Sequence, residues 1–268
     1  MSSVAVQKPS TTEKALKFVE KAKLPPAPKK PKGKQAKAGA PAEFDFDKHK
    51  NEALVVGSDI ISFVKGVTEQ RREDIVNSAL LAQLIANAAV PDKTHVFAWY
   101  DEYFDALTQI GWVVQDRQFV KHVAHGSSFE VHKAIIKLAT TLLGSGATAL
   151  VVVKETLDAL QSMDENSPWI TVFSQQSQAA KTARFQVTLA EQAPDGQFLV
   201  TLLAFGLSAA KQVTQVLFFK FGTSDVQLKH SSGKVTINDE VLNRIRSKVK
   251  ERLAEYADAF IKKLPDLG

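Results

Sequence analysis

The sequence predicts an α+β fold: a helical N-terminal half packed on an antiparallel β-meander, with a long C-terminal helix and a disordered basic tail in front. Three observations predict it. Apolar residues recur at helical spacing through the first half, the pattern changes to alternation near residue 185, and consecutive strand-like runs are joined by short turns. We expect a tail over residues 1–42 and a single α+β domain over residues 43–268.

The composition is that of an ordinary globular protein with enough apolar residues for a sizeable core. The chain has 268 residues, of which 44% are hydrophobic and 24% are charged. It has no cysteine, which excludes disulfides, thiolate metal ligands, a catalytic thiol and S-acylation. The first 40 residues hold ten lysines and two glutamates and carry +8, which leaves −3 for the rest of a chain whose net charge is +5. The basic character therefore belongs to the tail and does not indicate a basic nucleic-acid-binding fold.

The tail combines a spacer with a short helix. Residues 25–41 consist almost entirely of Pro, Lys, Ala and Gly, which predicts an extended linker. Ahead of it, Ser10 and Glu13 fit a capping box, and an apolar helical stripe follows at Ala15, Phe18, Val19 and Ala22. Three turns are marginal in water, so we expect this helix to form when docked on its own domain, a partner groove or an anionic bilayer.

Lysines of the spacer are the predicted binding residues for an anionic partner. They are Lys29, Lys30, Lys32, Lys34 and Lys37. A loosely basic, solubilising tail is the simpler interpretation of the same residues. The N-terminus has no apolar core of a secretory signal. We therefore expect cytoplasmic synthesis, with export or delivery by a non-classical route left open.

The first half of the body has helical periodicity in five segments, separated by one strand or tight hairpin over residues 112–123. Acids near the start of the second helix, Thr94 before the third, and Ser127 with Glu130 before the fourth are N-terminal signals. The predicted helices cover residues 48–67, 70–89, 94–111, 131–142 and 147–163.

The second half predicts strands followed by the last helix. Turn signals lie at residues 194–196 and 231–233, and Asn238 is a good N-cap for a final helix that reaches Phe260. The predicted strands cover residues 185–189, 198–205, 213–221, 226–228 and 235–237.

Two stretches are apolar enough to be compared with membrane segments. Residues 138–153 are sixteen uncharged residues, too few to span a bilayer and interrupted by glycines. Residues 198–219 contain the single charge Lys211 and fit strands that are buried on both faces. Both stretches are predicted to belong to the core, and no transmembrane helix is expected.

Catalytic and metal-binding patterns are absent from the sequence. His122, His125 and His132 are close in the chain, but no carboxylate or cysteine completes a metal site, so no metal is expected. Asp101, Glu102 and Asp105 are predicted to be solvated acids on a helix whose aromatic residues are mostly core. Ser127 and Ser128 lack the nucleophile elbow, and Gly144–Gly146 lacks the lysine of a phosphate loop. The chain is predicted not to be an enzyme, with no catalytic residues.

Several short, mostly apolar sequence motifs of the body occur in an order and with a spacing that match a known family. They are residues 79–86, Trp99-Tyr100, residues 110–115, residues 128–131, residues 184–187, residues 203–205 and residues 212–221. Over about residues 48–263 the chain resembles the Erwinia virulence factor (Evf)-like family of bacterial and fungal proteins. The resemblance covers almost all of the body and none of the tail.

The resemblance implies a compact α/β body without enzymatic activity, a link to host association or persistence, and fatty acylation of a buried cysteine. This chain departs from the family at that last point, because it has no cysteine to form the thioester. An apolar cavity is then either occupied by a non-covalent fatty acid or filled by large side chains such as Phe205, Phe218 and Phe219.

Two functions are compatible with these observations. The first is a non-enzymatic virulence- or persistence-type accessory factor that associates with lipid or a membrane surface, with the tail lysines attracted to anionic head groups. The alternative is a soluble interaction or cargo protein whose basic tail is a docking or delivery handle. The partner of that handle would be a protein, or, less favoured, nucleic acid, whose binding would weaken steeply with salt.

Overall fold

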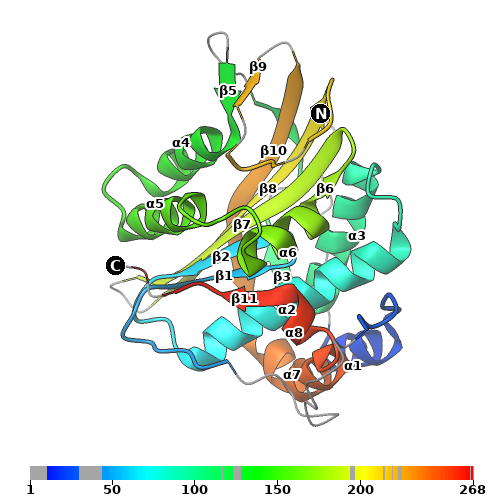
Figure 1. Cartoon of the computed structure of the whole chain (residues 1–268). Helices are drawn as coiled ribbons and strands as arrows, with labels where there is room; N and C mark the ends of the chain where they lie inside the picture. The colour runs from blue at the N-terminus through cyan, green and yellow to red at the C-terminus, as the bar shows by residue number, and fades with distance from the viewer. Residues whose placement is uncertain are drawn as a thin grey trace, which may run out of the picture.

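A large mixed sheet lies between two layers of helices (Figure 1). The computed structural model describes residues 11–29, 44–115, 117–122, 128–193, 197–213, 215–218, 220–222, 225–265 and 267. The strand order in the sheet is β11-β1-β2-β7-β8-β10-β3, with β6 beside β7 and β4 beside β10. The pair β2–β7 is parallel and the other pairs are antiparallel, so the predicted purely antiparallel meander is corrected to a mixed sheet.

The strands of this sheet come from both halves of the chain. Their bounds are β1 Glu52–Val56, β2 Asp59–Phe63, β3 Trp112–Val114, β4 Val120–Lys121, β6 Gln178–Ala179, β7 Thr182–Gln192, β8 Phe198–Ala209, β10 Val226–Ile237 and β11 Ile261–Lys263. A separate two-stranded ladder pairs β5 (Ser128–Glu130) with β9 (Lys220–Gly222).

The helices cover both faces of the sheet and create two hydrophobic cores. On one face lie α1 Thr12–Lys21, α2 Glu69–Ala89, α3 Val96–Gln109 and α7 Asp239–Leu253. On the other lie α4 Val131–Leu143, α5 Thr148–Gln161 and α6 Pro168–Ser177. The short α8, Ala257–Phe260, precedes β11. Strand β1 serves both cores: Leu54 and Val56 face the first, while Ala53 and Val55 face the second.

The helix predicted over residues 48–67 is wrong, because this segment is the β1–β2 hairpin. Every residue of both strands is buried, so the polar alternation that reveals a half-exposed strand is missing. Gly57 has φ 57° at the turn, a conformation that favours glycine. The apolar residues of this segment also happen to occur at helical spacing, which explains the wrong prediction.

The second half differs from its prediction in four places. Residues 213–221 are not one strand, since residues 216–218 form a turn and only Lys220–Gly222 pairs as β9. Strand β10 continues through the predicted turn at 231–233 and pairs with β8 without interruption from Val226 to Val235. Helix α6 was not predicted, although Ser167 caps it and Pro168 begins it. The last helix ends at Leu253, before α8 and β11.

Several local predictions are confirmed. Helices α2, α3, α4 and α5 lie where the periodicity placed them. The Asn238 side chain accepts hydrogen bonds from the N–H groups of Glu240 (3.0 Å) and Val241 (3.2 Å) at the start of α7. At α4, Glu130 occupies the N-cap but its side chain makes no capping hydrogen bond to the helix N-terminus, and Ser127 lies outside the described residues.

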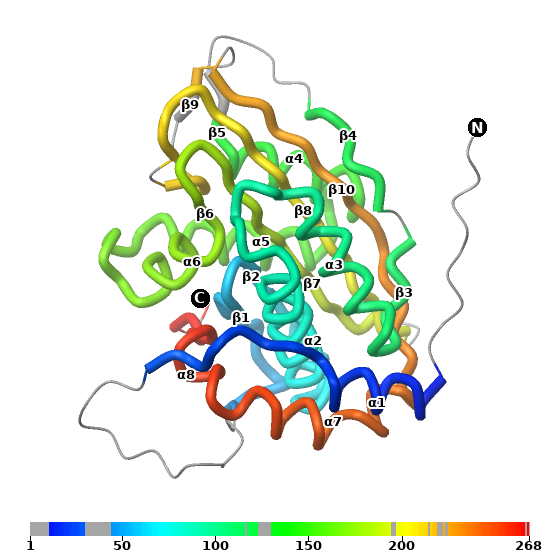
Figure 2. Tube along the Cα trace, turned by 90° about the vertical axis from the view of Figure 1, so that its right-hand side faces the viewer, coloured from blue at the N-terminus to red at the C-terminus, as the bar shows by residue number. Residues whose placement is uncertain are grey.

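Helix α1 docks on its own domain, which is one of the three docking sites left open by the sequence. Ala15 and Val19 are completely buried, and α1 lies along α7 (Figure 2). Beyond the helix, Arg252 donates to the carbonyl oxygen of Ala22, and the Tyr256 hydroxyl donates to that of Pro25 at 2.6 Å. Helix α1 and the residues that follow it as far as Pro25 are thus held against α7 and the residues just after it.

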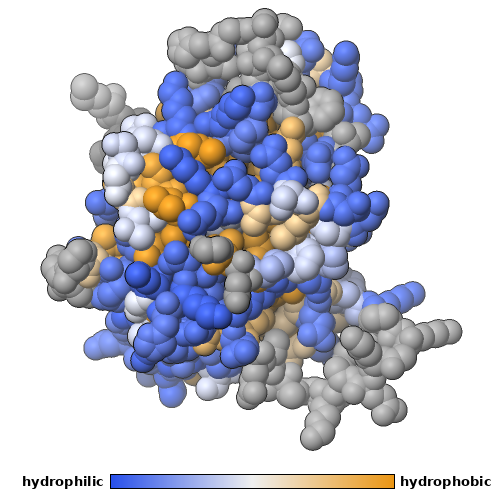
Figure 3. Space-filling view, turned by 60° about the vertical axis from the view of Figure 1, so that its left-hand side comes forward, coloured by the Kyte–Doolittle hydropathy of each residue, from blue (hydrophilic) through white to orange (hydrophobic). Residues whose placement is uncertain are grey.

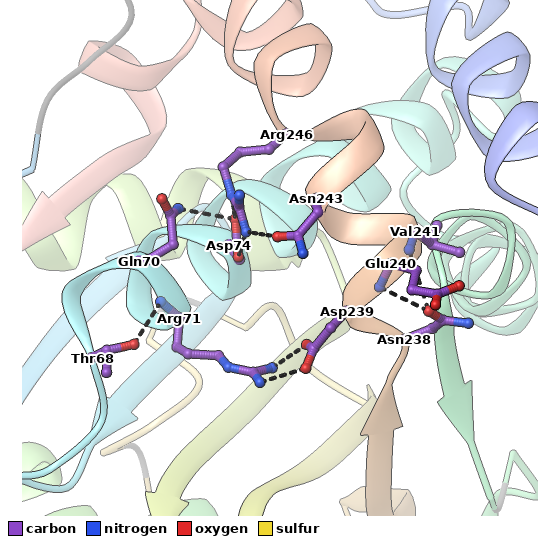
Figure 4. Close-up of polar contacts among 10 residues, drawn as sticks. All are labelled: Thr68, Gln70, Arg71, Asp74, Asn238, Asp239, Glu240, Val241, Asn243 and Arg246. Atoms are coloured by element: carbon purple, nitrogen blue, oxygen red, sulfur yellow. Dashed lines mark hydrogen bonds and ion pairs between the residues drawn. The ribbon is translucent and has the colours of Figure 1, made fainter.

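Ion pairs join α2 to its neighbours. Arg71 and Asp239 form a bidentate pair between α2 and α7, and Arg246 of α7 binds Asp74 of α2 at 2.7 and 2.8 Å (Figure 4). A third pair is fully buried: Arg72 contacts Glu52 of β1 and donates to three main-chain carbonyl groups. The buried pair should contribute more to stability than the exposed Arg71–Asp239 pair. Removing Glu52 would leave the buried, desolvated Arg72 without its counter-charge, whereas an exposed arginine is solvated by water.

Candidate ligand-binding groove

A groove of about 360 Å³ opens between the first turn of α3 and strands β7, β8 and β10. The residues that line it come from one helix end and three adjacent strands. They are Thr94, His95, Val96, Phe97, Ala98, Thr182, Gly206, Leu207, Ser208, Gln227 and Lys229. Most of these lining groups are apolar or uncharged, and Lys229 is the cation among them.

The floor of the groove depends on a glycine. Gly206 of β8 lies in register between Arg184 of β7 and Lys229 of β10. A Cβ atom at this position would lie 3.0 Å from Val96 and 3.2 Å from the ring of Phe97. The missing side chain therefore lets the first turn of α3 lie against the sheet. On the same face, Ser208 pairs in register with Thr182 and Gln227, and these three residues extend the floor.

The rim carries an exposed aromatic ring beside an ammonium group. Phe97 is 41% exposed and contacts Phe119 edge-to-face at 5.1 Å between ring centroids. The Nζ atom of Lys229 lies 4.8 Å from the centroid of Phe97, in cation–π geometry. Lys121 of β4 is the register partner of Lys229, which brings a second lysine to this part of the sheet. The rim thus combines apolar surface with positive charge.

The positive end of the α3 dipole points to the same place. The first turn of α3 contains no acidic residue, and His95 occupies its N-cap without capping the helix N–H groups through its side chain. The nearest acid, Asp92, accepts from the N–H (2.9 Å) and the hydroxyl (2.7 Å) of Thr94, and these hydrogen bonds lower the pKa of its carboxyl. A helix start of this kind favours a negative group within the first turn.

A buried arginine supports the groove from below. The guanidinium of Arg184 donates to the carbonyl oxygen of Lys93 at 3.1 Å and to Asn87 at 3.0 Å, and lies 4.4 Å from the ring centroid of Trp99. Arg184 is 2% exposed, and burial lowers its pKa to about 10, so it stays charged at neutral pH. These contacts fix the segment that enters α3.

Tyr100 ties α3 to the centre of the sheet. Its hydroxyl donates to the main-chain carbonyl of Phe185 at 2.8 Å and accepts from the Gln186 side chain at 2.9 Å and the Phe205 N–H at 3.2 Å. Burial raises the pKa of Tyr100 well above its usual value. The phenol is therefore a neutral structural bridge.

A buried carboxyl lies on the same face of the sheet. Asp59 of β2 is fully buried and accepts from the Thr188 hydroxyl at 2.8 Å. Its Oδ1 atom has no hydrogen-bond partner within the described part of the chain. Burial raises the pKa of Asp59 to about 7. The sequence analysis did not identify Asp59 or Arg184 as buried charged residues. The signal that could have revealed each of them is a single charged residue next to apolar residues of a strand.

The predicted lysine site lies almost entirely outside the described residues. Lys29 is exposed at the end of the segment that α1 begins, while Lys30, Lys32, Lys34 and Lys37 lie outside the described residues. Phe205 is buried and stacks on Phe185 at 4.7 Å, Phe218 is partly buried, and Phe219 lies outside the described residues.

The prediction that Asp101, Glu102 and Asp105 are solvated acids is confirmed, because all three are exposed on α3. His132 lies 3.5 Å from Glu130, His122 lies beside His230, and His125 is outside the described residues. Within the described ranges, no group of three or more His, Cys, Asp or Glu residues is arranged to hold a metal ion. Nor does any helix in these ranges have the length and apolar character needed to cross a bilayer.

Comparison with solved structures returns matches that include the Evf virulence factor, the family that the sequence resembles. That match has 10% sequence identity and a TM-score of 0.36, and covers 77% of this chain and 85% of the other. A delta-endotoxin matches with 13% identity and a TM-score of 0.40 over 82% of this chain and 96% of the other. Activated monomeric Cyt2Ba from Bacillus thuringiensis subsp. israelensis matches with 15% identity and a TM-score of 0.30, covering 48% and 72%. No protein-family model and no curated protein matches the chain.

Proposed function

We propose that this chain is a non-enzymatic accessory factor that associates with lipid, and that the groove beside α3 receives an acyl chain with an anionic head group. The observation that carries the proposal is the composition of the groove, which has a volume of about 360 Å³ and an uncharged floor beneath one lysine and an exposed phenylalanine. The virulence- or persistence-type setting of this activity comes from the sequence resemblance.

The size and chemistry of the groove suit such a ligand. Pockets for small molecules span about 300–1,000 Å³ and combine apolar walls with a few polar groups that fix orientation. Each methylene removed from water contributes about 0.8 kcal/mol. A carboxylate or phosphate at the rim would meet Lys229 and the positive end of the α3 dipole.

The ligand must be held without a covalent bond. The chain has no cysteine for a thioester, so a bound fatty acid would exchange with free fatty acid. This separates the proposal from acylation, and makes reversible binding its direct readout.

Binding of a fluorescent fatty acid, and its displacement by oleate, tests the groove. We expect Ser208→Trp to block binding, because Ser208 lines the groove on β8, the middle one of its three strands, and an indole there would fill part of the groove. We expect Lys229→Gln to weaken binding about tenfold or more, since a hydrogen bond to a charged group contributes about 1.5–3 kcal/mol. Lys234→Gln, an exposed lysine on the same strand, is the matched control. Equal binding by all four proteins, or no binding by the unchanged chain, would refute the groove as the lipid site.

The tail lysines are proposed to add attraction to an anionic membrane surface. A lysine near such a surface contributes about 1 kcal/mol, so Lys29, Lys30, Lys32, Lys34 and Lys37 together would matter. Their test is replacement of all five by glutamine in the full chain, followed by flotation with anionic vesicles. Deletion of residues 1–42 is unsuitable, because it also removes α1 with its buried Ala15 and Val19.

The alternative function has its own outcome in these assays. If neither oleate nor vesicles bind, the chain is better described as an interaction or cargo protein whose tail docks on a protein partner or nucleic acid. A nucleic-acid complex would weaken steeply with salt, since counterions are released on binding.

A further inference from the structure

The end of the α4–α5 hairpin is an uncharged surface on the face of the sheet opposite to the groove. Helix α4 ends at Leu143, α5 begins at Thr148, and the two helices lie side by side, joined by a short turn (Figure 1). All sixteen residues from 138 to 153, called the hairpin end below, lack a charge. Uncharged stretches of this length are expected in a core, yet this one lies at a free end of the molecule.

One side of the hairpin end is packed and the other is open. Ala139, Leu150 and Val153 are buried in the second core. Val151 is 50% exposed, Leu142 is only partly buried, and the turn residues Gly144–Gly146 are exposed. Figure 3, which brings this side of the molecule forward, shows apolar side chains gathered on the surface among pale and hydrophilic ones.

Two exposed lysines bound the hairpin end at the same level. Lys137 directly precedes it on α4 and Lys154 directly follows it on α5. Six helical residues separate each lysine from the turn, which at 1.5 Å per residue places the lysines about 9 Å behind the tip of each helix. The nearest acids of α5, Glu155 and Asp158, lie beyond Lys154 and away from the tip.

We propose that the hairpin end enters the interface of an anionic phospholipid bilayer, with Lys137 and Lys154 at the level of the lipid phosphates. Interfacial helices bury their apolar surface about 5–10 Å deep, which agrees with the distance from tip to lysines. Lysine side chains reach outward from an apolar environment toward anionic groups. In a bilayer, an apolar interior lies beneath a layer of anionic phosphates. The hairpin end matches both layers, because its uncharged tip is followed by two lysines at one level, and binding to a protein partner would not require this arrangement.

This inference rests on the proposed membrane association and assigns the surface that makes the contact. The groove and the hairpin end belong to opposite faces of the sheet, so variants in one leave the other intact. A lipid could therefore be held in the groove while the hairpin end contacts the bilayer.

The absence of cysteine allows a direct test in the full chain. A single cysteine is introduced at Val151, at Ser162 on the far end of α5, or at Ser208 in the groove, and is labelled with an environment-sensitive dye. With phosphatidylcholine–phosphatidylserine vesicles, we expect a blue shift at Val151 that is quenched by lipids brominated on the acyl chain. Ser162 is the matched control on the same helix, and no change is expected there.

Charge variants provide the second measurement. Replacing Lys137 and Lys154 with glutamine should weaken partition onto these anionic vesicles about 30-fold, which corresponds to about 1 kcal/mol for each lysine. Binding to neutral phosphatidylcholine vesicles should be unchanged. Val151→Asp, a substitution at an exposed position, should abolish partition while the circular dichroism spectrum stays the same.

The possible results separate this inference from the proposed function. If the chain floats with vesicles but the label at Val151 does not respond, the hairpin end is not the contact and only this inference is overturned. If the chain does not float, membrane association fails together with it, while fatty-acid binding in the groove is decided by its own assay. A response at Val151 that needs no lipid and rises with protein concentration would assign the surface to contacts between copies, which also overturns the inference.

Discussion

Replacement of Asp59 by asparagine should make the protein less sensitive to pH. Asp59 is completely buried, receives one hydrogen bond from Thr188, and has one oxygen without a partner in the described part of the chain. Burial is the main cause that raises its pKa from 3.8 to about 7. Asparagine has almost the same shape as a protonated aspartic acid and cannot ionise, so it keeps the packing and removes the titration.

The size of the effect follows from the difference between the pKa values of the folded and unfolded states. The folded pKa is the higher one, so the contribution of Asp59 to stability is complete below about pH 4 and is lost as the pH rises through about 7. At 1.36 kcal/mol for each pH unit, this difference corresponds to about 4 kcal/mol. The stability of Asp59→Asn relative to the unchanged protein should therefore rise by about 4 kcal/mol across this window and stay constant above it.

Urea denaturation at a series of pH values between about 4 and 8 measures this difference. Comparing two proteins at each pH cancels the contributions of the other carboxylates, and the tyrosines near Asp59, Tyr100 and Tyr103, have raised pKa values and stay neutral. Asp101→Asn, at an exposed position, is the control and should show no such trend. A difference that is the same at every pH would refute the reasoning, because it would mean that Asp59 is ionised in both states or protonated in both.

Three further predictions concern the ion pairs, the docking and the N-cap that stabilise the helices. Glu52→Ala should destabilise the protein by about 3–5 kcal/mol in urea denaturation, because it leaves a buried arginine without its partner, while Asp239→Ala in an exposed pair should cost about 1 kcal/mol or less; equal costs would contradict the burial of the first pair. Val19→Asp should release α1, seen as faster amide hydrogen exchange over Thr12–Lys21, and Lys17→Asp on the exposed side should not; the same exchange in both variants would show that α1 is not docked through Val19. Asn238→Ala should cost about 1 kcal/mol through loss of the α7 N-cap, and unchanged thermal stability would argue against the two hydrogen bonds of this cap.

Local signals were sufficient for the helices whose apolar stripe and caps lie within one segment. The periodicity of residues 70–89 gave α2, and Asn238 marked the start of α7, because a cap and a stripe act over a few residues. The same reasoning failed over residues 48–67. Layers of helices on both sides of β1 and β2 bury all of their residues, and a strand buried on both faces has no alternation to detect.

The groove could not be predicted for a related reason. Phe97, Gly206 and Lys229 come from α3, β8 and β10, and only the strand register and the packing of α3 bring them together. Gly206 lies within the apolar stretch 198–219 and carries no local signal of its role, whereas in the structure its missing side chain makes room for Val96 and Phe97. The uncharged stretch 138–153 was visible in the sequence, but its position at a free end of the α4–α5 hairpin was not.

The sequence by itself determined the chemistry that this protein can carry: no thiol for acylation, a basic tail on a slightly acidic body, and helices marked by their own stripes and caps. The tertiary structure alone decided which strands pair, that α1 rests on α7, and which residues from distant segments form the groove and its buried supports. Charge and capping act within a few residues, so they can be read along the chain. Whether a strand is buried on both faces, which strand it pairs with, and how much space lies above a glycine all depend on the elements packed against it. These elements come from distant parts of the chain, so no local sequence pattern reveals them.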